Sequence, residues 1–187
     1  VKPSTSEPVS TWNEFTVVFR STIGPKGSEL NVLYGAEVDC INRKGEYVEL
    51  KTQFKALGIG RFYDSKTMKW WIQSYLAGIR KIFVGIRTDR GIVNSIEEVV
   101  VNELRDKAQK WQASICMKFL HTFLHRVRDI LFSSPEGTIL LAERNPSQEH
   151  VQFTKLFYEM PEYEKYNLLT EEFKLYFSPR GLKRSYS

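Results

Sequence analysis

The sequence predicts an α+β fold in which a mixed, largely antiparallel sheet is flanked by helices. Residues 33–53 alternate apolar and polar side chains on both sides of a turn, which is the period of a half-buried β-hairpin. Residues 65–78 and the stretch from Trp111 onward repeat apolar side chains every three to four residues, as amphipathic helices do. The length of 187 residues suits one domain, and we expect residues 1–11 to be a flexible lead-in and residues 12–187 to belong to a single domain.

Composition narrows the class of protein. A formal charge of +5 fits a polyanionic ligand such as nucleic acid but does not identify one. Cys40 and Cys116 lack the spacing of a metal site, and we expect reduced thiols in an intracellular protein. No apolar run approaches ~18 residues, so the sequence predicts no membrane span.

The first predicted element is a helix from Trp12 to Ile23. Thr11 and Glu14 have the spacing of a capping box, and Gly24-Pro25 would end the helix. The predicted apolar face consists of Trp12, Phe15, Val18, Phe19 and Ile23.

The register of the hairpin at residues 33–53 decides its chemistry. A three-residue turn, Arg43-Lys44-Gly45, with Gly in a left-handed conformation sets Asn42 opposite Glu46. Asp39 then faces Glu49, and Glu37 faces Lys51. A two- or four-residue turn would place Asp39 and Glu49 on opposite faces of the sheet. We favour the three-residue turn.

The predicted register creates a candidate metal site. Like charges on directly opposed residues destabilise a sheet, so Asp39 and Glu49, with Glu37 beside them, favour a bound cation. Carboxylate ligands suit Mg²⁺ or Mn²⁺, and Lys51 would supply a positive charge for a developing oxyanion. The alternative is an ordinary solvated face of a sheet, on which opposed Glu and Lys side chains are common.

The second predicted helix spans residues 65–78. Its predicted buried stripe consists of Met68, Trp71, Ile72, Tyr75 and Leu76. Lys66, Lys69 and Gln73 lie on another face, where an amide could hold a phosphate oxygen and a lysine could hold a nucleic-acid backbone. By spacing alone Gln73 is an ordinary exposed residue.

Strands are predicted at residues 81–88 and 91–95, joined by a tight turn, and residues 102–110 form a loop or frayed helical turn. The helix from Trp111 has a wide apolar face of Ile115, Phe119, Phe123, Val127 and Leu131, backed by Cys116, Leu120 and Leu124. His121 and His125 on the other side lack a third ligand for zinc. Further strands are predicted at residues 138–143 and 151–157, followed by a basic end with Arg180, Lys183 and Arg184.

Three motifs in this order resemble the DXO family of decapping exoribonucleases, which has a PD-(D/E)XK-like nuclease core. They are Gly35-Ala36-Glu37-Val38-Asp39-Cys40, Glu46-Tyr47-Val48-Glu49-Leu50-Lys51-Thr52, and Lys69-Trp70-Trp71-Ile72-Gln73-Ser74-Tyr75-Leu76-Ala77-Gly78-Ile79. The resemblance implies that Asp39, Glu49 and the Leu50 carbonyl bind a divalent metal and that Glu37 acts through a bound water. It also implies that Lys51 and Gln73 contact the attacking water or the scissile phosphate.

The family resemblance implies quality control of RNA 5′ ends: removal of incompletely methylated or NAD caps and of 5′ triphosphates, with 5′-to-3′ exoribonuclease activity in many members. Some members bind a large 5′-to-3′ exoribonuclease, and the nucleus is slightly favoured over the cytoplasm. Members carry an upstream half with a further metal-binding Glu, which we expect to be supplied by a missing segment or a second chain. The alternatives are a non-catalytic partner that stabilises an exoribonuclease, or a DNA-directed nuclease with the same core.

Overall fold

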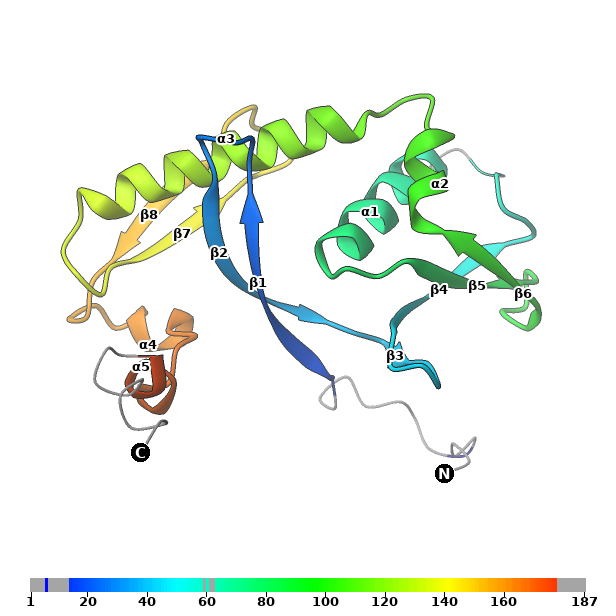
Figure 1. Ribbon diagram of the computed structural model, residues 1–187, viewed down its shortest axis with the longest axis horizontal. Helices are drawn as coiled ribbons and strands as arrows, with labels where there is room; N and C mark the ends of the chain where they lie inside the picture. The colour runs from blue at the N-terminus through cyan, green and yellow to red at the C-terminus, as the bar shows by residue number, and fades with distance from the viewer. Residues whose placement is uncertain (1–5, 7–13, 59, 61–62, 178–187) are drawn as a thin grey trace. The chain divides into compact units, whose positions relative to one another are not determined.

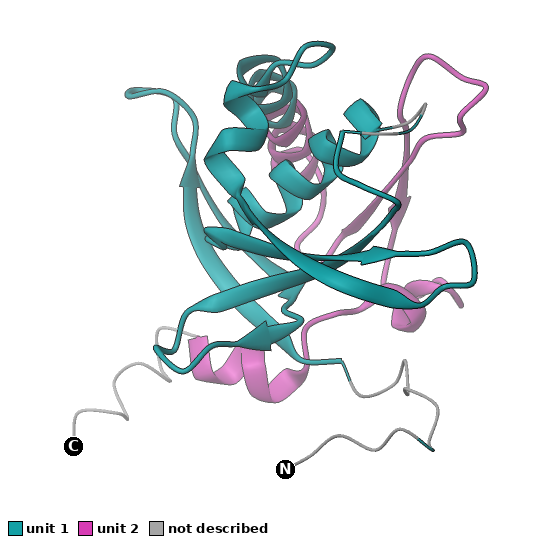
Figure 2. Cartoon of the chain, turned by 90° about the vertical axis from the view of Figure 1, so that its right-hand side faces the viewer, with its two compact units in different colours: residues 1–122 teal, residues 123–187 magenta. Residues whose placement is uncertain are grey.

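The computed structural model describes residues 6, 14–58, 60 and 63–177. The chain divides into two compact units, Val1–Thr122 and Phe123–Ser187 (Figure 2). Within the described ranges, helices and mostly antiparallel strand pairs form an α+β arrangement, which confirms the predicted fold class (Figure 1). No described helix combines the length and apolar character that crossing a membrane requires.

The first unit begins with an antiparallel pair of strands, β1 (Thr16–Ile23) and β2 (Leu30–Glu37). The helix predicted from Trp12 to Ile23 is therefore wrong over its described part, and the Thr11 cap lies outside the described residues. Exposed and more buried side chains alternate along the whole of β1. The β-branched residues of its sequence Thr-Val-Val-Phe-Arg-Ser-Thr-Ile suit a strand, and β2 supplies the hydrogen-bonding partner.

The second sheet of this unit has the strand order β3-β4-β5-β6. Its strands are β3 (Cys40–Ile41), β4 (Tyr47–Phe54), β5 (Lys81–Arg87) and β6 (Val93–Val100). The β4–β5 pair is parallel, and helix α1 (Tyr63–Leu76) forms the crossover between these two strands. The predicted turn between β5 and β6 is present, with Gly91 at φ +80°.

The core of the first unit lies between this sheet and the helices α1 and α2 (Val101–Asp106) (Figure 1). Ile82 and Val84 of β5 are fully buried and belong to the same cluster as Trp71 of α1. Trp70 is also buried, whereas Tyr75 of the predicted stripe is exposed. Residues 102–110 are predicted as a loop or frayed helical turn, but residues 102–106 belong to helix α2, whose Val101 and Leu104 are buried.

Helix α3 (Ala113–Phe132) confirms the helix predicted from Trp111, and the boundary between the two units falls within it. Two residues of the predicted apolar face are wrong: Ile115 and Phe119 are 62% and 65% exposed. In the first unit, Cys116, which is predicted to back this face, and Met117 pack against the core. The core of this unit therefore covers the Cys116 side of the predicted face.

The second unit contains the antiparallel hairpin of β7 (Ile139–Glu143) and β8 (Gln152–Leu156), at the predicted positions. Two short helices follow, α4 (Tyr163–Tyr166) and α5 (Glu171–Phe177). The buried Tyr163 donates a hydrogen bond of 2.7 Å from its hydroxyl to the Gly137 carbonyl. The basic end predicted at Arg180, Lys183 and Arg184 lies outside the described residues.

Candidate active site

The hairpin between β3 and β4 has the predicted register. Cys40 pairs with Val48 and Ile41 with Tyr47, so the three-residue turn is confirmed. Asn42 closes it: its N–H donates to the Glu46 carbonyl at 3.0 Å, and its carbonyl accepts from the Gly45 N–H at 3.0 Å. Gly45 has φ +78°, the left-handed conformation that the turn requires.

The first arm of this hairpin is shorter than predicted. Strand pairing with β4 covers only Cys40 and Ile41, and Glu37 pairs with Thr16 of β1 rather than with Lys51. The chain leaves the β1–β2 pair at Val38, whose N–H donates to the Phe15 carbonyl at 2.9 Å. The predicted pairing of Glu37 with Lys51 is therefore wrong, because Val38 and Asp39 leave the strand conformation and the pairing with β4 does not extend past Cys40.

Asp39 nonetheless reaches β4. Its Oδ2 accepts a hydrogen bond of 2.7 Å from the backbone N–H of Leu50, the residue after Glu49. This bond holds the exposed Asp39 carboxylate beside the strand that carries Glu49 and Lys51. Asp39 and Glu49 lie close enough for both charges to raise the pKa of Cys40, although burial of the Cys40 thiol is the larger cause.

Glu49 is the most unusual residue of the group, because it is an acidic side chain that is only 1% exposed. Its Oε1 accepts a charged hydrogen bond from Lys51 Nζ. Its Oε2 is buried and has no hydrogen-bond partner among the described residues. Burial raises the pKa of Glu49, the bond and charge of Lys51 oppose this increase, and the charges of Asp39 and Glu37 add to it.

Lys51 is held between two oxygen acceptors. Besides its bond to Glu49, its Nζ donates to Gln73 Oε1 of α1 at 3.3 Å. The parallel β4–β5 crossover brings α1 beside β4, so Gln73 meets Lys51 across 22 residues of sequence. An ammonium group has three donors, which leaves a third for a ligand.

A divalent metal fits part of this arrangement. The buried, unpartnered Oε2 of Glu49 is a strong oxygen ligand in need of a cation, and Asp39 has a second carboxylate oxygen beside the one that binds Leu50. Within the described ranges, no three His, Cys, Asp or Glu side chains are grouped closely enough to hold a metal by themselves. The residues therefore suit Mg²⁺ or Mn²⁺ held by two carboxylates, with waters and phosphate completing the coordination, rather than a closed protein cage.

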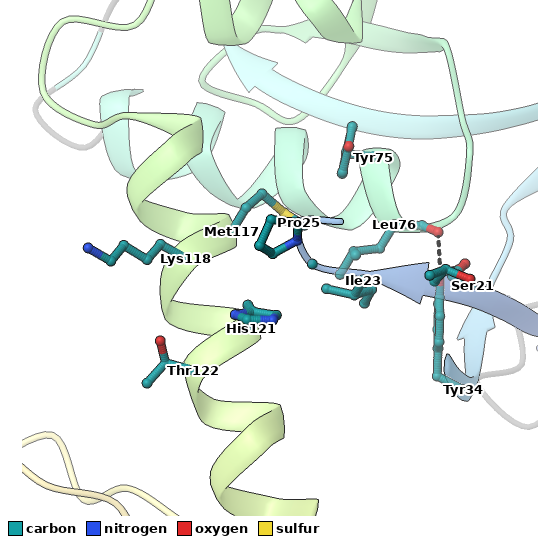
Figure 3. A pocket seen from close by; sticks show the side chains of 12 residues that line it. Ser21, Ile23, Pro25, Tyr34, Tyr75, Leu76, Met117, Lys118, His121 and Thr122 are labelled. Carbon is teal, nitrogen blue, oxygen red and sulfur yellow. Dashed lines mark hydrogen bonds between the residues drawn. The ribbon is translucent and has the colours of Figure 1, made fainter. Parts of the chain in front are cut away.

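A hollow of about 740 Å³ in the first unit is lined by none of these carboxylates. Figure 3 shows Met117 and His121 of α3 on one side of it and Leu76 of α1, with Tyr34 of β2, on the other. The Tyr34 hydroxyl donates to the Leu76 carbonyl at 2.6 Å, and His121 Nε2 lies 2.7 Å from the Ser28 carbonyl. His121 thus contacts the turn between β1 and β2.

One functional candidate escaped the sequence analysis. Gln53 of β4 is 4% exposed, and its Oε1 accepts a hydrogen bond of 3.2 Å from Lys66 Nζ of α1. Glu49, Lys51 and Gln53 alternate along β4 and therefore point to the same side of the strand. This alternation is visible in the sequence, but the partner on α1 is not.

Comparison with known proteins is consistent with this geometry. The family model described as "RAI1 like PD-(D/E)XK nuclease" matches residues 1–174. Decapping nuclease dom-3 of Caenorhabditis elegans is 34% identical over 145 residues, which cover 74% of this chain and 37% of that protein. Decapping and exoribonuclease protein Rai1 of Drosophila melanogaster is 32% identical over 146 residues, which cover 70% of this chain and 38% of that protein.

A solved structure supports the same assignment. The crystal structure of S. pombe Rai1 in complex with 3′-FADP matches with a TM-score of 0.59 and 26% identity, over 69% of this chain and 44% of that one. This chain thus spans less than half the length of each of these relatives. The chain belongs to the family of RAI1-like PD-(D/E)XK nucleases.

Proposed function

We propose that the complete protein is a metal-dependent nuclease that acts on RNA 5′ ends. It would remove incompletely methylated or NAD caps and 5′ triphosphates and degrade RNA in the 5′-to-3′ direction. Family membership supports the reaction class, and two relatives carry the names decapping nuclease and decapping and exoribonuclease protein. The observation that carries the proposal is the buried carboxylate of Glu49, beside Asp39 and bonded to Lys51.

Asp39 and Glu49 would hold the metal directly, with the Leu50 carbonyl as a further ligand and Glu37 acting through a water. When bound, Mg²⁺ or Mn²⁺ would lower the pKa of a coordinated water and offset negative charge on the phosphate. The Leu50 N–H orients Asp39 for this role. Burial of Glu49 keeps water away from its carboxylate, which strengthens its attraction for a cation.

Lys51 and Gln73 would act on the substrate. With two of its donors directed at Glu49 and Gln73, Lys51 has one N–H for a phosphate oxygen or for the attacking water. These two contacts restrict the rotamers of Lys51, so its charge is in place before the reaction begins. Neither residue reads a base, which fits an enzyme that acts on 5′ ends of any sequence.

The proposal is tested with Asp39→Ala and Glu49→Gln in the complete protein. Both variants should release 5′-end products from capped or triphosphorylated RNA at least roughly a hundredfold more slowly, because a metal ligand is lost. Glu46→Gln, at an exposed position of the same hairpin, is the matched control. Unchanged rates in both site variants would exclude the proposed reaction, and equal rates on matched RNA and DNA would exclude RNA as the preferred substrate.

We also infer, from family membership, that a 5′-to-3′ exoribonuclease is a partner of the complete protein and that the two meet in the nucleus. A pull-down with the wild type and with Glu49→Gln separates this role from catalysis. Binding by both proteins would support the partnership, and binding by neither would remove it.

A further inference from the structure

The side of β4 that carries Glu49 and Lys51 continues to a second polar pair, Gln53 and Lys66. A buried strand position that faces a helix is ordinarily apolar, yet Gln53 is 4% exposed. Burying an amide costs about 1–3 kcal/mol unless it is hydrogen-bonded. Here the bond that Gln53 Oε1 accepts comes from Lys66 Nζ, at 3.2 Å. Gln53 is therefore placed to hold a surface lysine in position.

The partner of Lys66 in this pair is a neutral amide, which brings no negative charge to the lysine. Among the described residues, no carboxylate lies within ion-pair distance of Lys66 or of its neighbour Lys69. By contrast, Asp64 at the start of the same helix pairs with Lys110 at 3.1 Å. The exposed Lys66 and Lys69, called here the α1 lysines, thus carry two charges that the described part of the protein does not neutralise.

The α1 lysines lie in line with the candidate active site. Lys66, Lys69 and Gln73 are three and four residues apart, so they share one face of α1. Gln73 contacts Lys51, and Lys66 contacts Gln53, so this face runs along β4. From Lys66 to Gln73 the helix rises through seven residues, or about 10 Å. This face is therefore long enough to contact more than one phosphate group of a strand.

We propose that the α1 lysines bind the sugar-phosphate backbone of single-stranded nucleic acid beyond the reacting 5′ end, and that Gln53 positions Lys66 for this contact. This inference rests on the proposed function, which identifies the substrate strand as RNA that enters the site by its 5′ end. It adds a second contact region that only a longer strand can reach, so the affinity for the substrate depends on its length. Lysines bind phosphates as point charges and read no sequence, so the preference is for a longer strand of any sequence.

The test measures how binding of a 5′-monophosphorylated oligonucleotide of about ten nucleotides depends on salt, in a Glu49→Gln background that prevents cleavage. Each phosphate neutralised on a single strand contributes about 0.7 to the slope of log affinity against log salt. Lys66→Ala/Lys69→Ala should therefore lower this slope by about 1.4. Between about 50 and 200 mM salt, the protein with both lysines should lose roughly sevenfold more affinity than the variant.

Two controls separate this effect from a general loss of charge or of structure. Lys26→Ala/Lys44→Ala removes the same charge from two exposed turns and should leave the slope unchanged. Gln53→Met keeps Lys66 but releases it, and should lower the slope by about half as much as the double lysine variant. Affinity for a 5′-phosphorylated dinucleotide should be unchanged in all three, because it does not extend past the active site.

The proposal is overturned if the α1 lysine variant keeps the slope of the parent protein, or if the Lys26/Lys44 control lowers it equally. Failure of the proposed function gives a different result. In that case Glu49→Gln would retain full activity in an otherwise unchanged protein, whatever the salt dependence of binding. A length-independent loss of affinity would place the lysines at the reacting end and would also contradict the proposal.

Discussion

At the scale of single residues, Glu49 has the properties that define the site: it is buried, and it forms an ion pair with Lys51. Its spacing from Asp39 and Lys51 is visible in the sequence, and those residue types are what predict a metal site. Its burial is not visible, because Glu is ordinarily exposed and nothing nearby in the sequence marks this one as enclosed. The folded chain excludes solvent from Glu49, and this exclusion raises its pKa.

The raised pKa of Glu49 predicts a pH dependence of stability. The folded chain holds the Glu49 proton up to a higher pH than the unfolded chain, whose Glu49 titrates near 4.5. The contribution of Glu49 to the free energy of unfolding therefore falls as the pH rises from about 4.5 through the raised pKa. Measured by metal-free denaturant unfolding, wild type should gain stability relative to Glu49→Gln as the pH is lowered through this range.

Glu46 provides a control of opposite sign. A hydrogen bond from the Asn42 side chain is the main cause that lowers the pKa of Glu46. Its stabilising contribution is present above its unfolded pKa and is lost as the pH falls through the lowered value. Wild type should thus lose stability relative to Glu46→Gln on acidification. A pH-independent difference between wild type and Glu49→Gln would contradict the burial of an ionisable Glu49.

At the scale of elements, the sequence predicted the type of a turn better than it predicted which strands pair with each other. The Arg43-Lys44-Gly45 turn has its predicted length because Gly45 meets a local conformational requirement. Residues 12–23 illustrate the opposite case, since their apolar side chains fit a helix, whereas residues 16–23 form strand β1. The pairing of β1 with β2 decides between the two, and that pairing joins residues up to 21 positions apart.

Two turn glycines of the first unit should differ in their tolerance of alanine. A Cβ added at Gly45 meets nothing within 4 Å, so only its φ of +78° is unfavourable, and Gly45→Ala should cost about 1 kcal/mol. A Cβ at Gly24 would lie 2.6 Å from the His121 ring and 2.7 Å from the Ser28 carbonyl oxygen. Gly24→Ala should therefore cost at least about 2 kcal/mol in denaturant unfolding. Equal losses of stability in the two variants would contradict this prediction and show that the turn at Gly24 rearranges to accept a Cβ.

At the scale of the whole molecule, every residue of the proposed site lies in the first of the two compact units. The strands and helix that carry the site also surround the core of that unit, in which Trp71, Ile82 and Val84 are almost completely buried. Ligands of the site therefore act on the stability of the unit that contains β4 and α1. The overall charge of +5 is compatible with nucleic acid but does not locate its binding surface.

Metal binding should stabilise the first unit. At a free Mg²⁺ or Mn²⁺ concentration about 100 times the dissociation constant, the free energy of unfolding should rise by about 2.7 kcal/mol. Hydrogen exchange should slow in β4 and α1 but not in β7 and β8, which contain no proposed ligand. Glu49→Gln should abolish both effects, and stabilisation that persists in this variant would place the metal elsewhere.

The sequence by itself determined the fold class, the register of the β3–β4 hairpin and the residues from which a site could be built. These features depend on local chemistry: a left-handed glycine, alternation along a strand, and the spacing of Asp39, Glu49 and Lys51. Only the tertiary structure decided that residues 16–23 form a strand, that Glu37 pairs with β1, and that Gln53 holds Lys66. Each of these depends on a contact between distant parts of the chain, whose free energy outweighs the preferences of neighbouring residues.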